Sequence, residues 1–311
     1  MLTVLKTALE VGLIYGLVAL ALFISFSILN IADLSTDGCF TLGCAVGAML
    51  TIAGHPLLAL PAAMAAGMLS GFITAFLQTR LGVESILAGI ISNTGLYTIN
   101  LAVMGFSSNV SITGRATVFS LFKALTGGSQ WSTLVLLALL LGVIAVVLIR
   151  FFGTSLGLSI RATGDSLDMV SASSINPKAT ITIGLCLANA LTALSGCLIG
   201  EYNKFCDINL GTGMVTIALA SLIIGEVFAG RRGGVGKRVV CVVLGSIVYR
   251  LIIALALRLN ISAEYFKLVS AVIVAVAIAA PNMKDYVHLA KIRSNARKLR
   301  ALSGKGDATD A

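Results

Sequence analysis

The chain has 311 residues, of which 58% are hydrophobic and only 11% are charged, and its mean hydropathy is +1.01. Soluble domains carry about 25% charged residues, so this composition excludes an ordinary soluble protein and indicates that most of the chain lies in lipid. The net charge of +9 would suggest a nucleic-acid partner in a soluble protein. Here the basic residues gather at the ends of apolar runs, as in membrane proteins, and no nucleic acid is expected.

Apolar runs follow one another along most of the chain. A helix needs roughly 20 apolar residues to cross a bilayer, and the candidate spans are residues 9–29, 38–53, 57–78, 85–105, 131–149, 179–200, 213–229, 239–257 and 268–281. The run 38–53 is short and rich in Gly and Ala, which is typical of a half-helix or a re-entrant element. We therefore expect an all-α polytopic bundle of eight to ten transmembrane helices in one domain, residues 1–283, followed by a basic tail, 284–311.

Two aspartates precede the short run 38–53. Asp33 and Asp37 lie in NIADLSTDG, where Ser35 and Asp37 are plausible helix N-cap residues. A broken helix also presents free N–H groups to a central pathway, so capping and a place on that pathway are compatible readings.

The span 85–105 carries a polar stripe. Asn93, Tyr97 and Asn100 are spaced by four and three residues and so share one helix face. Polar side chains at membrane depth either bond to a neighbouring helix or line a pathway. The sequence leaves both readings open.

Residues 161–178, RATGDSLDMVSASSINPK, separate two apolar runs and are longer than a simple connection requires. Gly164 is expected to break a helix, Asp165 or Ser166 to cap a new one, and Pro177 to end it or open the next span. The residues between them are too few to cross a membrane. They predict a short surface helix, either a solvated loop helix or a docking element for a soluble partner.

Basic residues set the expected orientation. They cluster in RRGGVGKR, residues 231–238, and in the tail at Lys284, Lys291, Arg293, Arg297, Lys298, Arg300 and Lys305. Lys and Arg are retained on the cytoplasmic side, so both segments and residues 161–178 are expected inside, with 106–130 and 201–212 outside. Glu226, near the cytoplasmic end of its run, is expected to pair with Arg231, to reach the interface, or to act in transport.

No catalytic or metal-binding pattern appears. The six cysteines lack a CxxC or Cys/His spacing and are expected to be buried thiols, and the two histidines stand far apart. There is no GxxxxGK[ST] pattern, so ATP hydrolysis is not expected in this chain. Pairs of glycines four residues apart, such as Gly43 and Gly47, predict close helix packing.

The stretch from Thr154 to Leu198 resembles the cytoplasmic region of permease subunits of bacterial ABC importers, in the branch for branched-chain amino acids and ribose. The family pattern G-x-x-x-R-A-x-G-x-x-x-x-M-A-x-x-x-G-I-N is matched by Gly157, Arg161, Ala162, Gly164, Met169, Ile175 and Asn176. It departs at Val170 and Ser174, where the family has Ala and Gly. NIADLSTDGCFTLGCAV is similar to the first conserved segment of the family. GEYNKFCDINLGTGMVTIALASLIIGEVFAG, followed by the basic loop and LGSIVYRLIIALALRL, resembles an amino-acid-associated subgroup.

The resemblance implies a coupling helix at about residues 163–176, with Arg161, Gly164, Asp165, Ser166, Leu167, Asp168 and Met169 facing a separate ATPase subunit that holds ATP and Mg²⁺. It also implies a second permease copy, identical or different, and a periplasmic or lipoprotein solute-binding protein. The expected function is import of a small solute, an amino acid of the aromatic or another class or a related compound, across the bacterial cytoplasmic membrane. The alternatives are an ion-gradient transporter coupled through Glu226 or Asp33, and a membrane scaffold or receptor without transport.

Overall fold

The computed structural model describes residues 2–230, 233–258, 268, 271–272 and 275. The predicted basic pair Arg231 and Arg232 and the tail 284–311 lie outside this part, as does most of the candidate span 268–281. The helices of the described part are α1 Leu2–Leu22, η1 Phe23–Ile28 (a π-helix), α2 Thr36–Ile52, α3 Pro56–Thr79, α4 Ser85–Val103, α5 Val118–Leu125, α6 Ser132–Phe151, α7 Ser155–Asp165, α8 Leu167–Ala172, α9 Pro177–Asn203, α10 Met214–Ala229 and α11 Val235–Arg258. Two short strands, β1 Asn109–Ser111 and β2 Phe205–Asp207, pair in antiparallel fashion.

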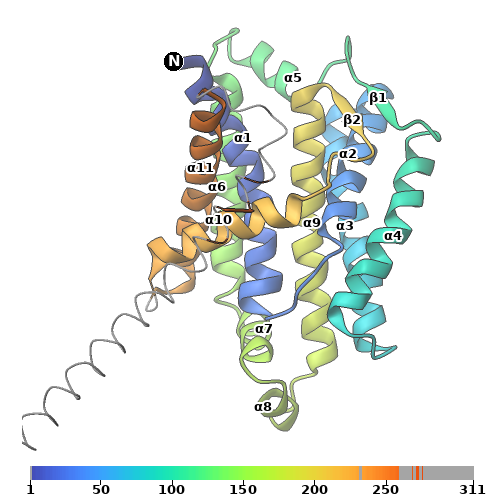
Figure 1. Ribbon diagram of the computed structural model, residues 1–311, viewed down its shortest axis with the longest axis vertical. Helices are drawn as coiled ribbons and strands as arrows, with labels where there is room; N and C mark the ends of the chain where they lie inside the picture. Colours follow the sequence, from blue (N-terminus) through green and yellow to red (C-terminus); the bar gives the residue numbers. More distant parts are fainter. Residues whose placement is uncertain (1, 231–232, 259–267, 269–270, 273–274, 276–311) are drawn as a thin grey trace, which may run out of the picture.

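The chain is an all-α polytopic membrane protein. In the described part, six helices are long and apolar enough to cross a membrane, namely those within Thr3–Ile28, Pro56–Thr79, Ser85–Val103, Ser132–Phe151, Pro177–Asn203 and Val235–Ala256. Two further apolar helices, α2 and α10, are shorter than these six spans. Figure 1 shows the long helices running along one axis, with α5 and the two strands at one end and α7 and α8 at the other. The expected short element at 38–53 is thus α2.

Helix α9 lies at the centre of the bundle and packs against α2 and α3. Glycines make this contact close: a Cβ at Gly43 would overlap the carbonyl of Ala193, and one at Gly67 would overlap that of Asn189. Lipid gives helices no hydrophobic reason to associate, so close approach through small residues drives their packing. The packing role predicted for the spaced glycines is confirmed here.

Helices α1 and α9 run in opposite directions, and the segments that follow them are alike. A connecting segment follows each of them: η1 and residues 29–35 after α1, and residues 204–213 with β2 after α9. A short helix (α2 or α10) then begins part-way along the bundle, and a long helix (α3 or α11) follows it (Figure 1). Helix α1 packs against α11, as α9 packs against α3. This is the arrangement of an inverted repeat, which is common in transporters and which the sequence does not reveal.

Candidate functional site

Helix α8 projects beyond the end of α9 and α7 lies beside that end, and we call residues 155–172 the tip (Figure 1). Hydroxyl groups begin both helices. The side chain of Thr154 accepts a hydrogen bond from Gly157 N at 3.3 Å, and that of Ser166 accepts one from Met169 N at 3.4 Å. Ser166 has an extended backbone (φ −161°), which separates the two helices. The tip therefore consists of two short helices, each capped by a hydroxyl group and separated at Ser166.

The tip differs from the predicted helix at about 163–176 in two respects. It is divided, because α7 ends at Asp165 and α8 covers only Leu167–Ala172. Gly164 does not break a helix but lies inside α7, where a Cβ would overlap the carbonyl oxygen of Ile28. Ser166 is the residue that caps the new helix, and Pro177 opens α9.

Five residues of the family-like pattern fall into two groups. Gly157 and Gly164 press against neighbouring backbone, and Asn176 caps α9 by accepting a hydrogen bond from Lys178 N at 3.1 Å. Arg161 and Met169 are exposed. The first three positions therefore shape the tip, while the last two are free to contact a partner.

The outward face of the tip combines apolar and charged side chains. Leu167 and Met169 are 53% and 57% exposed, and Arg161, Asp165 and Asp168 are exposed beside them. The opposite face is anchored: Val170 is fully buried, and the hydroxyl groups of Thr163 and Thr180 lie 2.8 Å apart in a hydrogen bond to α9. An exposed apolar patch rimmed by charges marks a protein contact.

Asp37 joins the starts of the two short helices. It lies in the first turn of α2, but its carboxylate accepts hydrogen bonds from Gly213 N and Val215 N at the start of α10, each at 2.9 Å. A carboxylate here satisfies free N–H groups and complements the helix dipole. Asp37 thus caps α10 rather than its own helix, and Ser35 makes no side-chain cap bond.

Asp33 is buried and holds the irregular stretch before α2 against α9. Its carboxylate accepts hydrogen bonds from Ser35 N at 2.8 Å, Ser35 Oγ at 2.6 Å and Asn189 Nδ2 at 2.8 Å. Irregular backbone at membrane depth is tolerated where protein covers it and its polar groups are satisfied. Asn189 could not be identified as the partner from local sequence patterns, since it lies 156 residues away.

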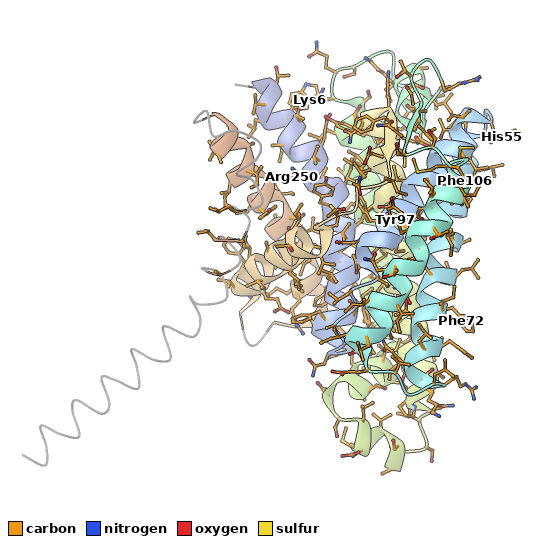
Figure 2. The ribbon with its side chains drawn as sticks, turned by 45° about the vertical axis from the view of Figure 1, so that its right-hand side comes forward. Lys6, His55, Phe72, Tyr97, Phe106 and Arg250 are labelled. Carbon is orange, nitrogen blue, oxygen red and sulfur yellow. The ribbon has the colours of Figure 1, made fainter. Side chains whose placement is uncertain are left out.

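The polar stripe on α4 divides between two environments. Asn100 is buried and its Nδ2 donates to the carbonyl of Gly38 at 3.0 Å, which ties α4 to α2. Asn93 is half-buried beside Gly38, whereas Tyr97 is 52% exposed at the middle of α4 (Figure 2). The interhelical role therefore applies to Asn100, and Tyr97 is the one that faces outward.

Helices α4 and α6 are similarly exposed but differ in chemistry. Only 28% of the α4 span and 22% of the α6 span are buried, yet their hydropathies are 1.4 and 3.0. The outward face of α4 carries Thr94, Tyr97 and Thr98 together with exposed apolar side chains such as Ile90 and Ile91, while that of α6 carries Leu139, Val143, Val146 and Val147. The composition of the α6 face suits lipid throughout, whereas the α4 face is apolar in its first half and carries polar groups from Thr94 onward.

Glu226, at the end of α10, forms an ion pair with Arg238 of α11 at 2.7 Å. Ser27 of η1 donates a hydrogen bond to Glu226 Oε1, and Arg238 donates one to Ser27 Oγ at 2.5 Å. The two charged side chains are 37% and 31% exposed. The ion pair expected for Glu226 is present with Arg238 as its partner; Arg231 lies outside the described residues.

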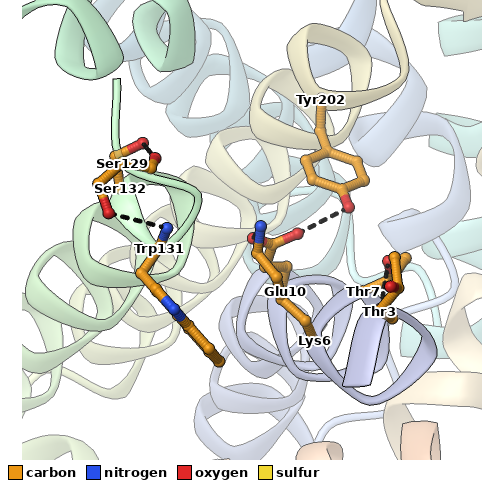
Figure 3. Close-up of polar contacts among 8 residues, drawn as sticks. All are labelled: Thr3, Lys6, Thr7, Glu10, Ser129, Trp131, Ser132 and Tyr202. Carbon is orange, nitrogen blue, oxygen red and sulfur yellow. Dashed lines mark hydrogen bonds and ion pairs between the residues drawn. The ribbon is translucent and has the colours of Figure 1, made fainter. Parts of the chain in front are cut away.

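The opposite end of the bundle carries two acids that the sequence analysis missed. Glu201 is buried and accepts hydrogen bonds from Val118 N at the start of α5, at 2.8 Å, and from Thr51 Oγ1, at 3.1 Å. Glu10 accepts one from the Tyr202 hydroxyl at 2.9 Å (Figure 3). Their position inside or beside apolar runs was the available signal, because ionisable residues at membrane depth need partners.

The described cysteines are free thiols, five of them buried and Cys186 half-buried. Over residues 2–230 and 233–258, no group of three His, Cys, Asp or Glu side chains is arranged to hold a metal ion.

Comparison with known proteins places the fold and the tip in context. Residues 4–278 match the model of a family described as the permease component of branched-chain amino acid transport systems. The chain is 31% identical over 273 residues to a tyrosine transport system permease protein of Clostridioides difficile, covering 88% of this chain and 89% of that protein. It is 31% identical over 285 residues to an uncharacterized protein of Rickettsia prowazekii, covering 91% and 99%. No solved structure matches the chain.

Proposed function

We propose that this chain, which belongs to the family of permease components of branched-chain amino acid transport systems, forms the membrane pathway of an ATP-driven importer of a small solute, an amino acid. The observation that carries the proposal is the tip. It is held rigidly on α9 and η1, and it presents Leu167 and Met169 beyond the membrane-spanning helices.

ATP hydrolysis takes place on a separate ATPase subunit that docks on the tip. The chain has no GxxxxGK[ST] pattern, so ATP and Mg²⁺ are held by that subunit. Leu167 and Met169 enter an apolar recess of the ATPase, and Arg161, Asp165 and Asp168 pair with charges around it. Gly164 and Ser166 give the tip the shape that this contact needs.

The pathway is formed with a second permease copy. Thr94, Tyr97 and Thr98 are exposed on the outward face of α4, between the exposed apolar residues Ile91 and Ile99. In the proposed assembly these three polar groups face a water-filled path rather than lipid. The second copy is identical to this chain in a homodimer or related to it in a heterodimer. Lipid covers α6 and the outer face of α3.

The transported solute is an amino acid, and tyrosine is the first to test. Support comes from the tyrosine transport permease of C. difficile, whose identity of 31% extends over most of both chains. A periplasmic or lipoprotein binding protein delivers the solute to the end of the bundle that carries α5 and the two strands.

The tip and the C-terminus lie in the cytoplasm of the bacterial cell, and the chain crosses its cytoplasmic membrane. Lys237 and Arg238 at the start of α11 and the basic tail favour this orientation, because Lys and Arg are retained inside. The strand end, with β1 and β2, then faces outward.

Reconstitution tests the proposal. The chain is placed in proteoliposomes with the ATPase and binding protein encoded beside it, and uptake of tritiated tyrosine, phenylalanine and leucine is measured. We expect uptake that requires ATP and both partners and that resists an ionophore. Uptake without the ATPase that the ionophore abolishes would show an ion-gradient transporter instead, and no flux of any solute under any condition would show a scaffold or receptor.

A further inference from the structure

Three helical elements meet where η1 ends near the tip. Ser27 of η1, Glu226 of α10 and Arg238 of α11 form one hydrogen-bonded cluster, which we call the Ser27 cluster. The guanidinium carbon of Arg238 also lies 5.0 Å from the centre of the Phe23 ring. The Arg238 side chain therefore contacts η1 at two residues, Ser27 and Phe23, and α10 at one, Glu226.

The tip contacts the same element from the other side. Gly164 of α7 lies directly on the Ile28 carbonyl, so that no larger residue fits without movement. The next residue, Leu29, packs its side chain against Gly184 of α9. A displacement of α7 thus reaches η1 through backbone contact, without a flexible side chain in between.

The wide turn of η1 makes it suited to change shape. Its bonds include Leu29 N to Ile24 O at 3.0 Å, and Ile31 N reaches back to Ser25 O at 2.8 Å. Asn30, which follows it, has φ +57°, in the left-handed region that few residues adopt. Single π-helical turns within longer helices are rare and are often found at functional sites.

Helix α10 connects the Ser27 cluster to the start of α2. It has 16 residues and so a length of about 24 Å. Glu226 fixes one end to η1, and Asp37 of α2 binds the backbone at the other. A carboxylate thus bonds each end of α10 to another helix: Glu226 bonds its last turns to η1, and Asp37 of α2 bonds its first turn.

We propose that the Ser27 cluster is the linkage through which movement of the tip tilts α10 and opens or closes the pathway, with Glu226 and Arg238 as positioning residues. The proposal rests on the proposed function, since it requires an ATPase that moves the tip. It assigns Glu226 neither ion binding nor contact with the solute. The cluster fixes the ratio of solute moved to ATP hydrolysed.

The test measures that ratio in proteoliposomes holding the whole complex, with tritiated tyrosine, or whichever of the three amino acids the wild-type chain takes up. Variants are Glu226→Gln, Arg238→Gln, the exchange Glu226→Arg with Arg238→Glu, and the milder Ser27→Ala, which leaves the ion pair. Arg150→Gln, at the exposed end of α6, is the matched control. Thermal midpoints and ATPase binding are recorded for each.

We expect Glu226→Gln and Arg238→Gln to lower the solute-to-ATP ratio about five-fold, with ATPase binding intact, and the exchange to recover at least part of it. Arg150→Gln should keep the wild-type ratio. An unchanged ratio in both single variants would overturn the linkage, as would a loss of uptake that follows lowered thermal stability or lost ATPase binding, since that is a structural role. Wild-type uptake without ATP would instead overturn the proposed function itself.

Discussion

Replacing Asp37 should release the half-buried start of α10. In Asp37→Ala two half-buried backbone N–H groups, those of Gly213 and Val215, lose the carboxylate that accepts them at 2.9 Å. A fully buried donor left unsatisfied costs about 1–3 kcal/mol, and each of these half-buried donors falls near the low end of that range. Loss of a helix cap costs about 0.5–2 kcal/mol. These costs overlap, so we expect a total of about 3 kcal/mol. Asp37→Asn keeps one acceptor oxygen and should lose about 1 kcal/mol, chiefly the charge on the helix dipole.

The assay is thermal inactivation in detergent at a fixed heating rate, because membrane proteins of this size unfold irreversibly. For a chain of this length about 1 kcal/mol shifts the midpoint by roughly 2 °C, so Asp37→Ala should melt about 6 °C lower. Asp207→Ala is the control, since Asp207 also accepts a backbone N–H bond, from Asn209 at 2.8 Å, but at an exposed site. A midpoint for Asp37→Ala within about 1 °C of the control would refute the reasoning that two half-buried donors depend on this carboxylate.

The remaining predictions concern α4 and the tip. Cysteines placed at Thr94 and Thr98 should react with a membrane-impermeant thiol reagent, whereas cysteines at Val143 and Val147 of α6 should not; equal labelling of both helices would exclude α4 from the pathway. Gly164→Ala should destabilise the chain by at least about 2 kcal/mol because its Cβ overlaps the Ile28 carbonyl. Gly142→Ala on α6, where a Cβ meets nothing within 4 Å, should instead stabilise the chain by about 0.5–1 kcal/mol. Thermal midpoints measure both changes. A Gly164→Ala chain as stable as Gly142→Ala would show that η1 moves away from the added methyl group at little cost in stability.

Much of the fold could be predicted from local patterns. The apolar run 131–149 became α6 and the short run 38–53 became α2, because span length and composition are properties of a continuous segment. The start of α8 at Ser166 also followed from its own neighbourhood. Local signals of this kind locate helices and some of their ends.

The partners of the polar residues could not be predicted in the same way. Asp37 binds α10 across 176 residues, and Asp33 binds Asn189 across 156. Helical periodicity says which residues share a face, but not which helix that face meets. Gly164 shows a related difficulty: glycine breaks helices by propensity, yet here close packing on η1 explains its presence inside one.

Variants of the tip provide the most direct test of the central claim, that a separate ATPase subunit binds this chain at the tip. Leu167→Asp with Met169→Asp places two charges on the exposed apolar surface, and Leu81→Asp is the control at another exposed leucine, 62% accessible, after α3. The measurement is ATP-dependent amino-acid uptake by the reconstituted complex, together with ATPase binding. We predict that the double variant folds normally but loses both, while Leu81→Asp keeps both. Full uptake and ATPase binding in the double variant would contradict the account.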